Sequence, residues 1–251
     1  MNLKNKQWSY SSIKLYESCP YAFYQKYIED KEESPNAMAQ HGKFVHEILE
    51  SYFKKEKAAF ELIFDFEADY PKRVTAQFPF FNMFKSFYSN TYDYLLNFEG
   101  IPDKYEVISV EEKIEGLVSK GLDFPTKGYW TIGFIDLILK DENGIIIVDH
   151  KSHGKWASKK ERKEYFRQLY IYSYLLHQQM GMKPYKLVFN KFRTNEWDEE
   201  LFKDSDYKEA INWFCSSIAC ALNETDWNCK INQFYCDNLC GFTDCAWNGR
   251  K

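Results

Sequence analysis

The chain has 251 residues, of which 45% are hydrophobic and 28% charged, and its formal net charge is −4. This composition excludes a disordered acidic tail, a low-complexity polymer and a collagen-like repeat, and the length is sufficient for one substantial core or two small ones. No apolar run approaches the roughly 20 residues that a membrane helix needs, and no signal-like apolar segment follows the polar N-terminus, so we expect a cytoplasmic protein without a membrane partner.

The first hundred residues are predicted to be mostly helical. From about Ser9 to Tyr27, aromatic and polar residues recur at helical spacing, with Ser11 or Ser12 as the N-cap and Pro20 at a helix boundary. After Gly42, apolar residues at positions 44, 45, 48, 49, 52 and 53 mark one face of a second helix. Helical patterns rich in aromatic residues then continue to about Phe98.

After Pro102 the pattern changes to that of strands. A half-exposed strand is predicted from Tyr105 to Ile114, and further strands are predicted over Tyr129–Leu139, Ile145–Val148 and Tyr185–Phe192. A long helix from Ser158 to about Gln179 has a basic first half, and a final helix precedes a cysteine-rich tail. With no repeat or low-complexity linker, residues 1–251 are expected to form one domain: a helical region to about 100, a catalytic sheet and helix over about 105–195, and a C-terminal helix and tail over about 205–251.

The seven cysteines indicate a metal or catalytic role. An odd number of cysteines without a secretory signal disfavours a disulfide framework. Cys236, Cys240 and Cys245 form a compact group, and a tetrahedral zinc site or a four-iron cluster would need a fourth donor, for which Cys229 is near in sequence and Cys19 far. Cys215 and Cys220 lie in a helical, apolar pattern and are interpreted as core residues.

The chemistry is expected at a hairpin that contains Asp136, Asp149 and Lys151. Opposite residues of an antiparallel pair have a constant index sum, and turns within Asp141–Gly144 allow sums of 285 or 287. The first register places Asp136 opposite Asp149 and the second places it opposite Lys151, so both gather two carboxylates and an ammonium on one face. Carboxylate oxygens suit Mg²⁺ or Mn²⁺, and the implied chemistry is phosphodiester hydrolysis. Taken alone, the three residues are far more typical of a structural Asp/Lys salt bridge on an exposed sheet face.

Further motifs resemble those of the PD-(D/E)XK nuclease superfamily, in particular its RecB-like, iron–sulfur branch, to which the AddAB nuclease and the CRISPR-adaptation exonucleases belong. The motifs are Gly42-x-x-x-His46, Asp136, Asp149-x-Lys151, Gln168-x-x-x-Tyr172, and Cys19 with the three tail cysteines. The resemblance covers residues 10 to 245 and implies an α/β (α+β) fold with a central mixed β-sheet flanked by helices.

The resemblance also implies roles for individual residues. The catalytic residues would be Asp136, Asp149, Lys151, Gln168 and Tyr172. A Mg²⁺ or Mn²⁺ ion would be held by His46, Asp136, Asp149 and the backbone carbonyl of His150. A 4Fe-4S cluster would be held by Cys19, Cys236, Cys240 and Cys245, although the spacing of three and four residues between the tail cysteines differs from the usual two and five and keeps Cys229 as a substitute.

The expected function is a metal-dependent DNA exonuclease acting on single-stranded ends. Since the sequence has no P-loop motif, a helicase partner would be needed to process duplex DNA efficiently. The resemblance also suggests a recombination or CRISPR protein as a partner. The first half of the long helix carries five basic residues: Lys159, Lys160, Arg162, Lys163 and Arg167. They either form a solvated helix end or, if they lie beside the metal site, contact DNA phosphates. The alternative function is a catalytically silent iron–sulfur DNA-binding or assembly subunit.

Overall fold

The computed structural model describes residues 3–249 and places five α-helices before the first strand. The first half of the chain forms α1 (Tyr10–Ser18), α2 (Pro20–Tyr27), α3 (Ala37–Phe53), α4 (Leu62–Arg73) and α5 (Phe81–Leu96), with short 3-10 turns at Leu3–Asn5 and Ala59–Glu61. The second half forms β1 (Glu106–Val118), β2 (Tyr129–Asp141), β3 (Gly144–Lys151), α6 (Lys159–Met180), β4 (Pro184–Lys191), β5 (Glu196–Leu201), α7 (Asp204–Leu222) and α8 (Gln233–Asn238).

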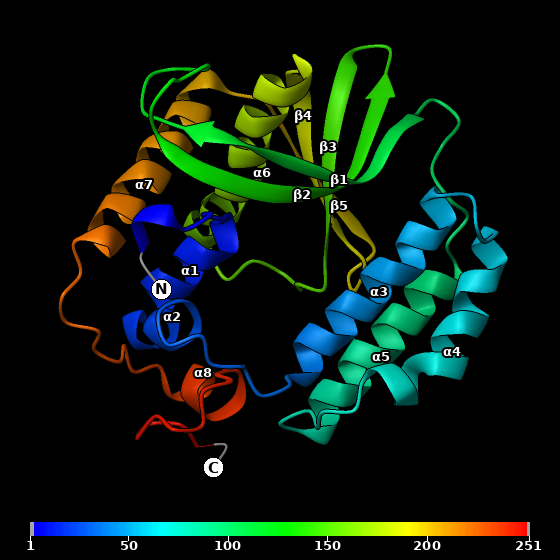
Figure 1. Ribbon diagram of the computed structural model, residues 1–251. Coiled ribbons are helices and arrows are strands. Elements are labelled where there is room, and N and C mark those ends of the chain that lie inside the picture. Colours follow the sequence, from blue (N-terminus) through cyan, green and yellow to red (C-terminus); the bar gives the residue numbers. More distant parts are fainter. Residues whose placement is uncertain (1–2, 250–251) are drawn as a thin grey trace.

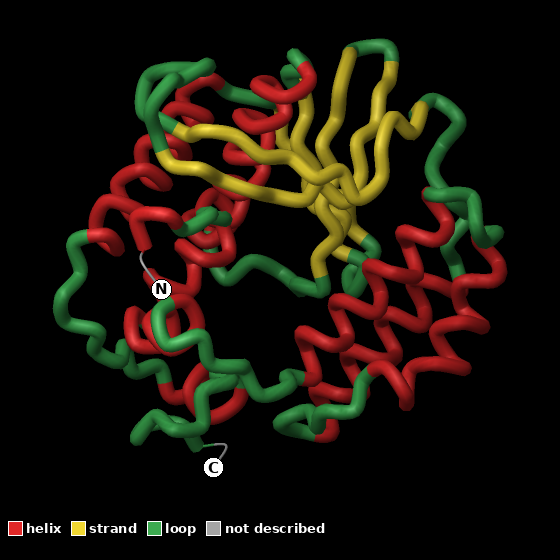
Figure 2. The backbone as a smooth tube through the Cα atoms, in the orientation of Figure 1, coloured by secondary structure: helices red, strands yellow, loops and turns green. Residues whose placement is uncertain are grey.

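The five strands form one mixed sheet in the order β1-β2-β3-β4-β5. All neighbours are antiparallel except β3 and β4, which are parallel and are joined by the crossover helix α6. Figure 2 shows the sheet with helices packed around it. The expected α/β fold with a mixed sheet flanked by helices is confirmed. The acidic edge strand β5 was not predicted, because its sequence lacks the apolar alternation of a half-buried strand.

Both faces of the sheet are buried, because alternate residues of each strand point to opposite sides. Ile147 belongs to a core with α6 and α7, whereas Ile146 and Val148 belong to a second core with α3, α4 and α5. In Figure 1 the helices α3, α4 and α5 form a lobe beside the sheet, and α1, α2 and α8 lie together at another corner. The lobe therefore presents one face of α3 to the strands that carry the acidic residues.

The helix starts depend on local capping. Ser9, rather than Ser11 or Ser12, caps α1: its hydroxyl accepts a hydrogen bond from the Ser12 N–H at 3.2 Å, while the Ser12 hydroxyl accepts one from the Ser9 N–H at 3.1 Å. Pro20 is the first residue of α2, where its missing N–H costs nothing. Asn36 caps α3, which therefore begins at Ala37, before the expected Gly42.

The prediction that both Cys215 and Cys220 are core residues is wrong for Cys220. Cys215 is buried, but Cys220 is exposed on the same helix. Five residues turn an α-helix by about 140° beyond one full rotation, so the two side chains cannot share a buried face. In residues 3–249, no helix has the length and apolar character needed to cross a membrane.

Candidate active site

The hairpin of β2 and β3 brings the predicted acidic residues together. Asp141 pairs with Gly144 and Leu137 with Val148, which confirms the register with an index sum of 285 and a two-residue turn. Continued by one residue, the same register places Asp136 opposite Asp149. Lys151 lies two residues further along β3, so its side chain emerges on the same face as that of Asp149.

The side chains of this face are within contact distance of one another. His46, from α3, places its Nδ1 atom 3.4 Å from Asp136 Oδ2, and Lys151 Nζ lies 2.6 Å from Asp149 Oδ2. The other carboxylate oxygen, Asp149 Oδ1, accepts a hydrogen bond of 2.8 Å from Gln168 Nε2. Two carboxylates, an imidazole and an ammonium therefore share one site, supported from α6 by an amide.

Backbone and helix contacts position these groups. The His150 N–H donates a 2.6 Å hydrogen bond to Asp136 Oδ2, and Gln168 Nε2 also donates one of 2.9 Å to Tyr172 Oη. Gln168 and Tyr172 are four residues apart on α6 and face the site together, as their spacing predicted. Both are buried, so they belong to the interior of the site rather than to a DNA-binding surface: Gln168 contacts the Asp149 carboxylate, and Tyr172 contacts Gln168.

The two carboxyl groups of the site differ in their electrostatic environment. Burial opposes ionisation of Asp136, but the nearby His46, His150 and Lys151 outweigh it and lower its pKa to about 2. Burial dominates at Asp149 and raises its pKa to about 6, despite the opposing charge of Lys151. Burial lowers the pKa of His46, but Asp136 outweighs this effect and raises it. Asp136 is therefore the firmly ionised member of the pair.

The structure adds Glu111 to the site, a residue that sequence reasoning missed. Val110 pairs with Leu137 and Glu112 with Ile135, so Glu111 of β1 lies opposite Asp136, in a left-handed backbone conformation with φ of 53°. Burial, and then the neighbouring Asp136, raises the pKa of its carboxyl to about 7. A constant index sum for the β1–β2 pair would have placed Glu111 opposite Asp136. The sequence does not fix that sum, because ten residues rather than a short turn connect the two strands.

These groups fit a hard divalent cation. One ligand atom each from His46, Glu111 and Asp136 lie within 4.8 Å of one another. Asp149 Oδ2 is buried, and its partner is the Lys151 ammonium at 2.6 Å. A cavity of about 430 Å³ opens beside the group and is lined by Lys43, His46, Glu47, Glu50, Glu111 and Asp136. Carboxylate oxygens with one imidazole nitrogen are a donor set suited to Mg²⁺ or Mn²⁺.

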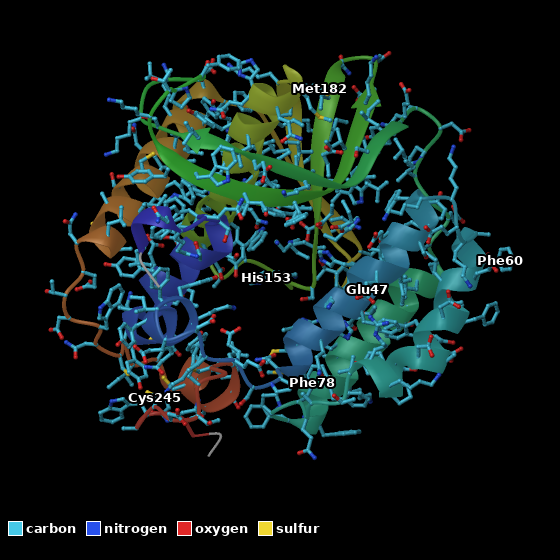
Figure 3. The ribbon with its side chains drawn as sticks, viewed as in Figure 1. Glu47, Phe60, Phe78, His153, Met182 and Cys245 are labelled. Atoms are coloured by element: carbon cyan, nitrogen blue, oxygen red, sulfur yellow. The ribbon has the colours of Figure 1, made fainter. Side chains whose placement is uncertain are left out.

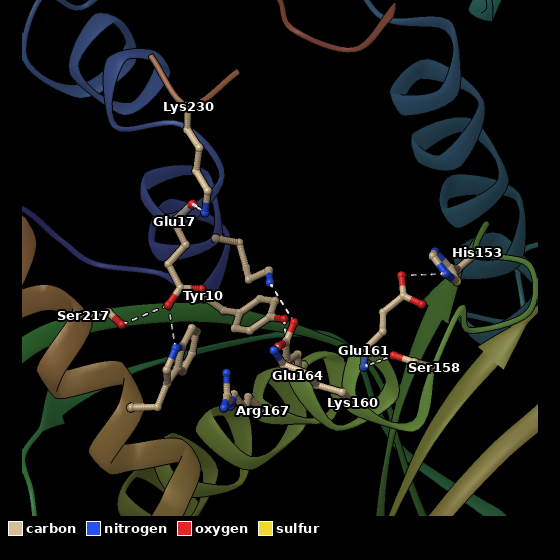
Figure 4. A network of polar contacts seen from close by, with 12 residues as sticks. Tyr10, Glu17, His153, Ser158, Lys160, Glu161, Glu164, Arg167, Ser217 and Lys230 are labelled. Carbon is tan, nitrogen blue, oxygen red and sulfur yellow. Dashed lines mark hydrogen bonds and ion pairs between the residues drawn. The ribbon is translucent and has the colours of Figure 1, made fainter. Parts of the chain in front are cut away.

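The expected role of the basic segment of α6 in binding phosphates is not supported for its arginines. Arg162 pairs with Asp198 at 2.7 Å and with Glu200 at 2.8 Å, and Arg167 pairs with Glu209 at 2.6 Å. Lys163 also lies 3.2 Å from Asp206. These charges are neutralised by acidic residues of β5 and α7. Figure 4 shows the neighbouring contacts at the start of α6, where Ser158 caps the helix and His153 faces Glu161.

The cysteines of the tail gather around Cys19. Cys19 and Cys240 share a small apolar cluster with the partly buried Cys229, whose Sγ atom lies 3.2 Å from Cys245 Sγ. Cys236 and Cys245 are also buried, and Figure 3 shows Cys245 beside α8. Burial and the adjacent Cys245 thiol raise the pKa of Cys229 to about 12. Both candidates for the fourth donor, Cys19 and Cys229, therefore lie with the three tail cysteines.

Comparison with known proteins agrees with this arrangement. No curated protein matches the sequence. Among solved structures, a "putative exonuclease" from Eubacterium rectale has a similar fold, with a TM-score of 0.50 and 16% sequence identity over 89% of this chain and 84% of the other. The family model of the PD-(D/E)XK nuclease superfamily matches residues 7–248. Since that match spans nearly the whole sequence, this chain belongs to the PD-(D/E)XK nuclease superfamily.

Proposed function

We propose that this nuclease is a metal-dependent DNA exonuclease of the RecB-like branch that acts on single-stranded ends. The observation that carries the proposal is the meeting of His46, Asp136, Asp149 and Lys151 at one face of the β2–β3 hairpin. The histidine from α3 and the Gln168–Tyr172 pair from α6 resemble the motifs of that branch; His46 contacts Asp136, and Gln168 contacts both Asp149 and Tyr172. The similarity to a solved structure described as an exonuclease supports the same reading.

The proposed metal ligands are His46, Asp136, Asp149 and the backbone carbonyl of His150, with Glu111 as an additional carboxylate. A bound Mg²⁺ or Mn²⁺ ion supplies charge neutralisation and a water of lowered pKa. Lys151 supplies a positive charge beside Asp149, where it can hold a phosphate oxygen or orient a water. Gln168 fixes the Asp149 carboxylate, and burial raises the pKa of Tyr172 so that its hydroxyl stays protonated and remains a hydrogen-bond partner.

We propose a 4Fe-4S cluster at Cys19, Cys236, Cys240 and Cys245, with Cys229 as the substitute ligand. A single zinc ion with Zn–S distances of about 2.3 Å needs sulfur atoms roughly 3.8 Å apart. Cys229 Sγ and Cys245 Sγ lie 3.2 Å apart, and Cys19 and Cys240 share one cluster with Cys229, so these thiols are placed to hold a common inorganic group. The choice of an iron–sulfur cluster over zinc rests on the resemblance of the cysteine motif to that of the iron–sulfur branch.

The test is degradation of end-labelled single strands in the presence of Mg²⁺ or Mn²⁺. We expect Asp149→Ala and Lys151→Ala to lower the rate at least a hundredfold with little change in DNA affinity, because they remove charge at the reaction centre. Lys127→Gln, an exposed residue of the β1–β2 loop, is the matched control. A circular single strand should survive, since an exonuclease needs an end.

Other outcomes of this test contradict the proposal. Cleavage of the circular strand would show an endonuclease. If the wild type binds DNA without cleaving it, and both variants lose this binding, the protein is the catalytically silent DNA-binding or assembly subunit instead. Efficient degradation of duplex without any helicase would contradict the proposed dependence on a partner.

A further inference from the structure

A second cavity lies at the C-terminal end of α3 and is not part of the acidic site. It has a volume of about 320 Å³ and lies between the helical lobe, the segment that precedes β1, and the β4–β5 edge of the sheet. Phe53 is one of its walls and follows His46 by two turns of the same helix, which is about 10 Å along the axis. The cavity is thus within reach of a strand whose scissile phosphate occupies the acidic site.

The walls of this cavity are mainly aromatic. Tyr105 and Trp197 stack with their ring centroids 5.8 Å apart, and Tyr94 packs on Phe98 with centroids 5.7 Å apart. All four residues line the cavity together with Phe53. Flat aromatic side chains on several sides provide surfaces on which a planar heterocycle can stack, and such stacking is tolerant of which base is bound.

One wall carries a buried polar atom that lacks a hydrogen bond. Asn190 is 2% exposed, and its Nδ2 atom donates to Tyr94 Oη at 2.9 Å and lies 3.0 Å from His150 Nδ1. The amide oxygen, Oδ1, has no hydrogen-bond partner in the described part of the chain. An unpaired buried acceptor is costly, and a ligand with an N–H group would satisfy it.

The His150 side chain contacts residues of both this cavity and the acidic site. Its ring stacks on Phe53 with centroids 5.8 Å apart and meets the His46 ring edge-on at 5.6 Å. His150 Nδ1 lies 3.0 Å from the Asn190 amide nitrogen and is placed to accept its hydrogen bond. At the mouth of the cavity, Lys104 is exposed, and no acidic side chain within residues 3–249 pairs with it.

We propose that this cavity, bounded by Phe53, Tyr94, Tyr105, Asn190 and Trp197, binds a nucleotide. The base stacks between the aromatic walls and donates an N–H to Asn190 Oδ1, while Lys104 holds a phosphate oxygen. The bound group is either an unstacked base of the DNA strand a few nucleotides from the cleaved bond, or a free deoxynucleoside monophosphate. The inference rests on the proposed nuclease function for its choice of ligand.

The experiment measures binding separately from cleavage. Affinity for a fluorescent single-stranded oligonucleotide is measured in Ca²⁺ without Mg²⁺ or Mn²⁺, using strands with one abasic site moved position by position from the end. For a strand base in the cavity, we expect one position to weaken wild-type binding about tenfold, the loss of one base stack. Ile101→Trp, which fills the cavity, should bind the intact strand about tenfold more weakly and lose the dependence on that position.

Titration with deoxynucleoside monophosphates separates the two sources of the ligand. If Ile101→Trp and Lys104→Gln both weaken binding of the free nucleotide, and abasic sites in the strand have no effect, the ligand of the cavity is a free nucleotide. Lys127→Gln is the charge-matched control and should bind as the wild type does. If neither an abasic site nor a free nucleotide distinguishes wild type from Ile101→Trp, the inference is wrong. Cleavage by the same wild-type preparation in Mg²⁺ shows whether the nuclease function stands independently.

Discussion

At the scale of single residues, the acidic site is defined by how its charges compensate one another. Asp136 contacts His46 and the His150 N–H, whereas Asp149 contacts Lys151 and Gln168. Each carboxylate has its own positive or polar partner, but burial dominates at Asp149, so the pKa of Asp136 is lowered and that of Asp149 is raised. At Glu111, burial and Asp136 outweigh the opposing charges of His46 and Lys54 and raise the pKa of its carboxyl to about 7, so a bound cation would favour its ionisation.

We expect Glu111→Gln to raise the Mg²⁺ concentration needed for half-maximal cleavage about tenfold, because the substitution removes a charged oxygen beside His46 and Asp136. Metal titrations of the cleavage rate measure this shift. The control is Glu112→Gln, whose carboxylate accepts a hydrogen bond from Ser109 instead. An equal shift in both variants would show that the effect reflects net charge rather than a ligand position.

His46→Ala should weaken metal-dependent cleavage more than DNA binding, since the imidazole contacts Asp136 at the proposed metal site. Cleavage rates at saturating DNA and dissociation constants in Ca²⁺ give the two quantities. A loss of the same size in both measurements would show that His46 acts through the fold or through substrate contacts.

At the scale of elements, the lobe of α3, α4 and α5 contains a buried neutral histidine. His41 is fully buried, and its ring nitrogens lie 3.0 Å from Tyr70 Oη and 3.0 Å from Thr91 Oγ1. Burial, with a smaller contribution from Arg193, lowers its pKa from 6.5 to about 3. The folded lobe therefore excludes a proton that the unfolded chain accepts below pH 6.5.

This histidine should make the protein less stable as the pH falls from 6.5 towards 3, with no further loss from this group below that range. At about 1.4 kcal/mol per pH unit, the contribution lost between pH 6.5 and 5 is about 2 kcal/mol. Urea unfolding at pH 7 and pH 5 measures it. His41→Gln should be less stable than wild type at pH 7 but lose less on acidification, and an identical loss in both proteins would contradict the assignment.

The contacts of helix α6 differ from those that its sequence predicts. Its basic residues resemble a phosphate-binding segment, yet Arg162 and Arg167 are held by carboxylates of β5 and α7. The contribution of the helix to the site comes instead from its buried face, through Gln168 and Tyr172. Lys159 and Lys160 at the start of the helix stay exposed, so the candidate phosphate contacts are these two lysines, Lys151 and the exposed Lys104.

At the scale of the whole molecule, the segment from Cys19 to Asn36 contacts the cysteine-rich tail. Asn36, which caps α3, also donates a 3.2 Å hydrogen bond to the Leu239 carbonyl, and Ser34 N–H donates one of 2.9 Å to the Gly241 carbonyl. Cys19 lies in the same cluster as Cys240. A group that bridged these cysteines would close a loop of more than two hundred residues, which restricts the unfolded chain strongly.

We expect Cys19→Ser to reduce bound iron and to lower the melting temperature by several degrees, because it removes both a ligand and the loop closure. Anaerobic iron and sulfide determinations, with thermal unfolding monitored by circular dichroism, measure the two effects. Cys220→Ser is the control, since Cys220 is exposed on α7. Full iron in Cys19→Ser with loss in Cys229→Ser would assign the fourth ligand to Cys229, and colourless protein carrying zinc would contradict the cluster.

The sequence by itself determined the features that depend on short-range geometry. The turn at Asp141–Gly144 sets the β2–β3 register within a few residues, and the spacing of Gln168 and Tyr172 sets their common helix face. Strand alternation then requires Asp136, Asp149 and Lys151 to share one side of the hairpin. These relations need no knowledge of the rest of the fold, because local backbone sterics and hydrogen bonding specify them.

Only the tertiary structure decided which distant groups complete these local patterns. Glu111 reaches the site because β1 pairs with β2 across a long connection, and the arginines of α6 are neutralised by elements that follow it in the chain. The aromatic cavity likewise draws its walls from α3, α5 and the β4–β5 edge. Such contacts depend on how whole elements pack and close long loops, a free-energy balance that is spread over many residues and has no short sequence signature.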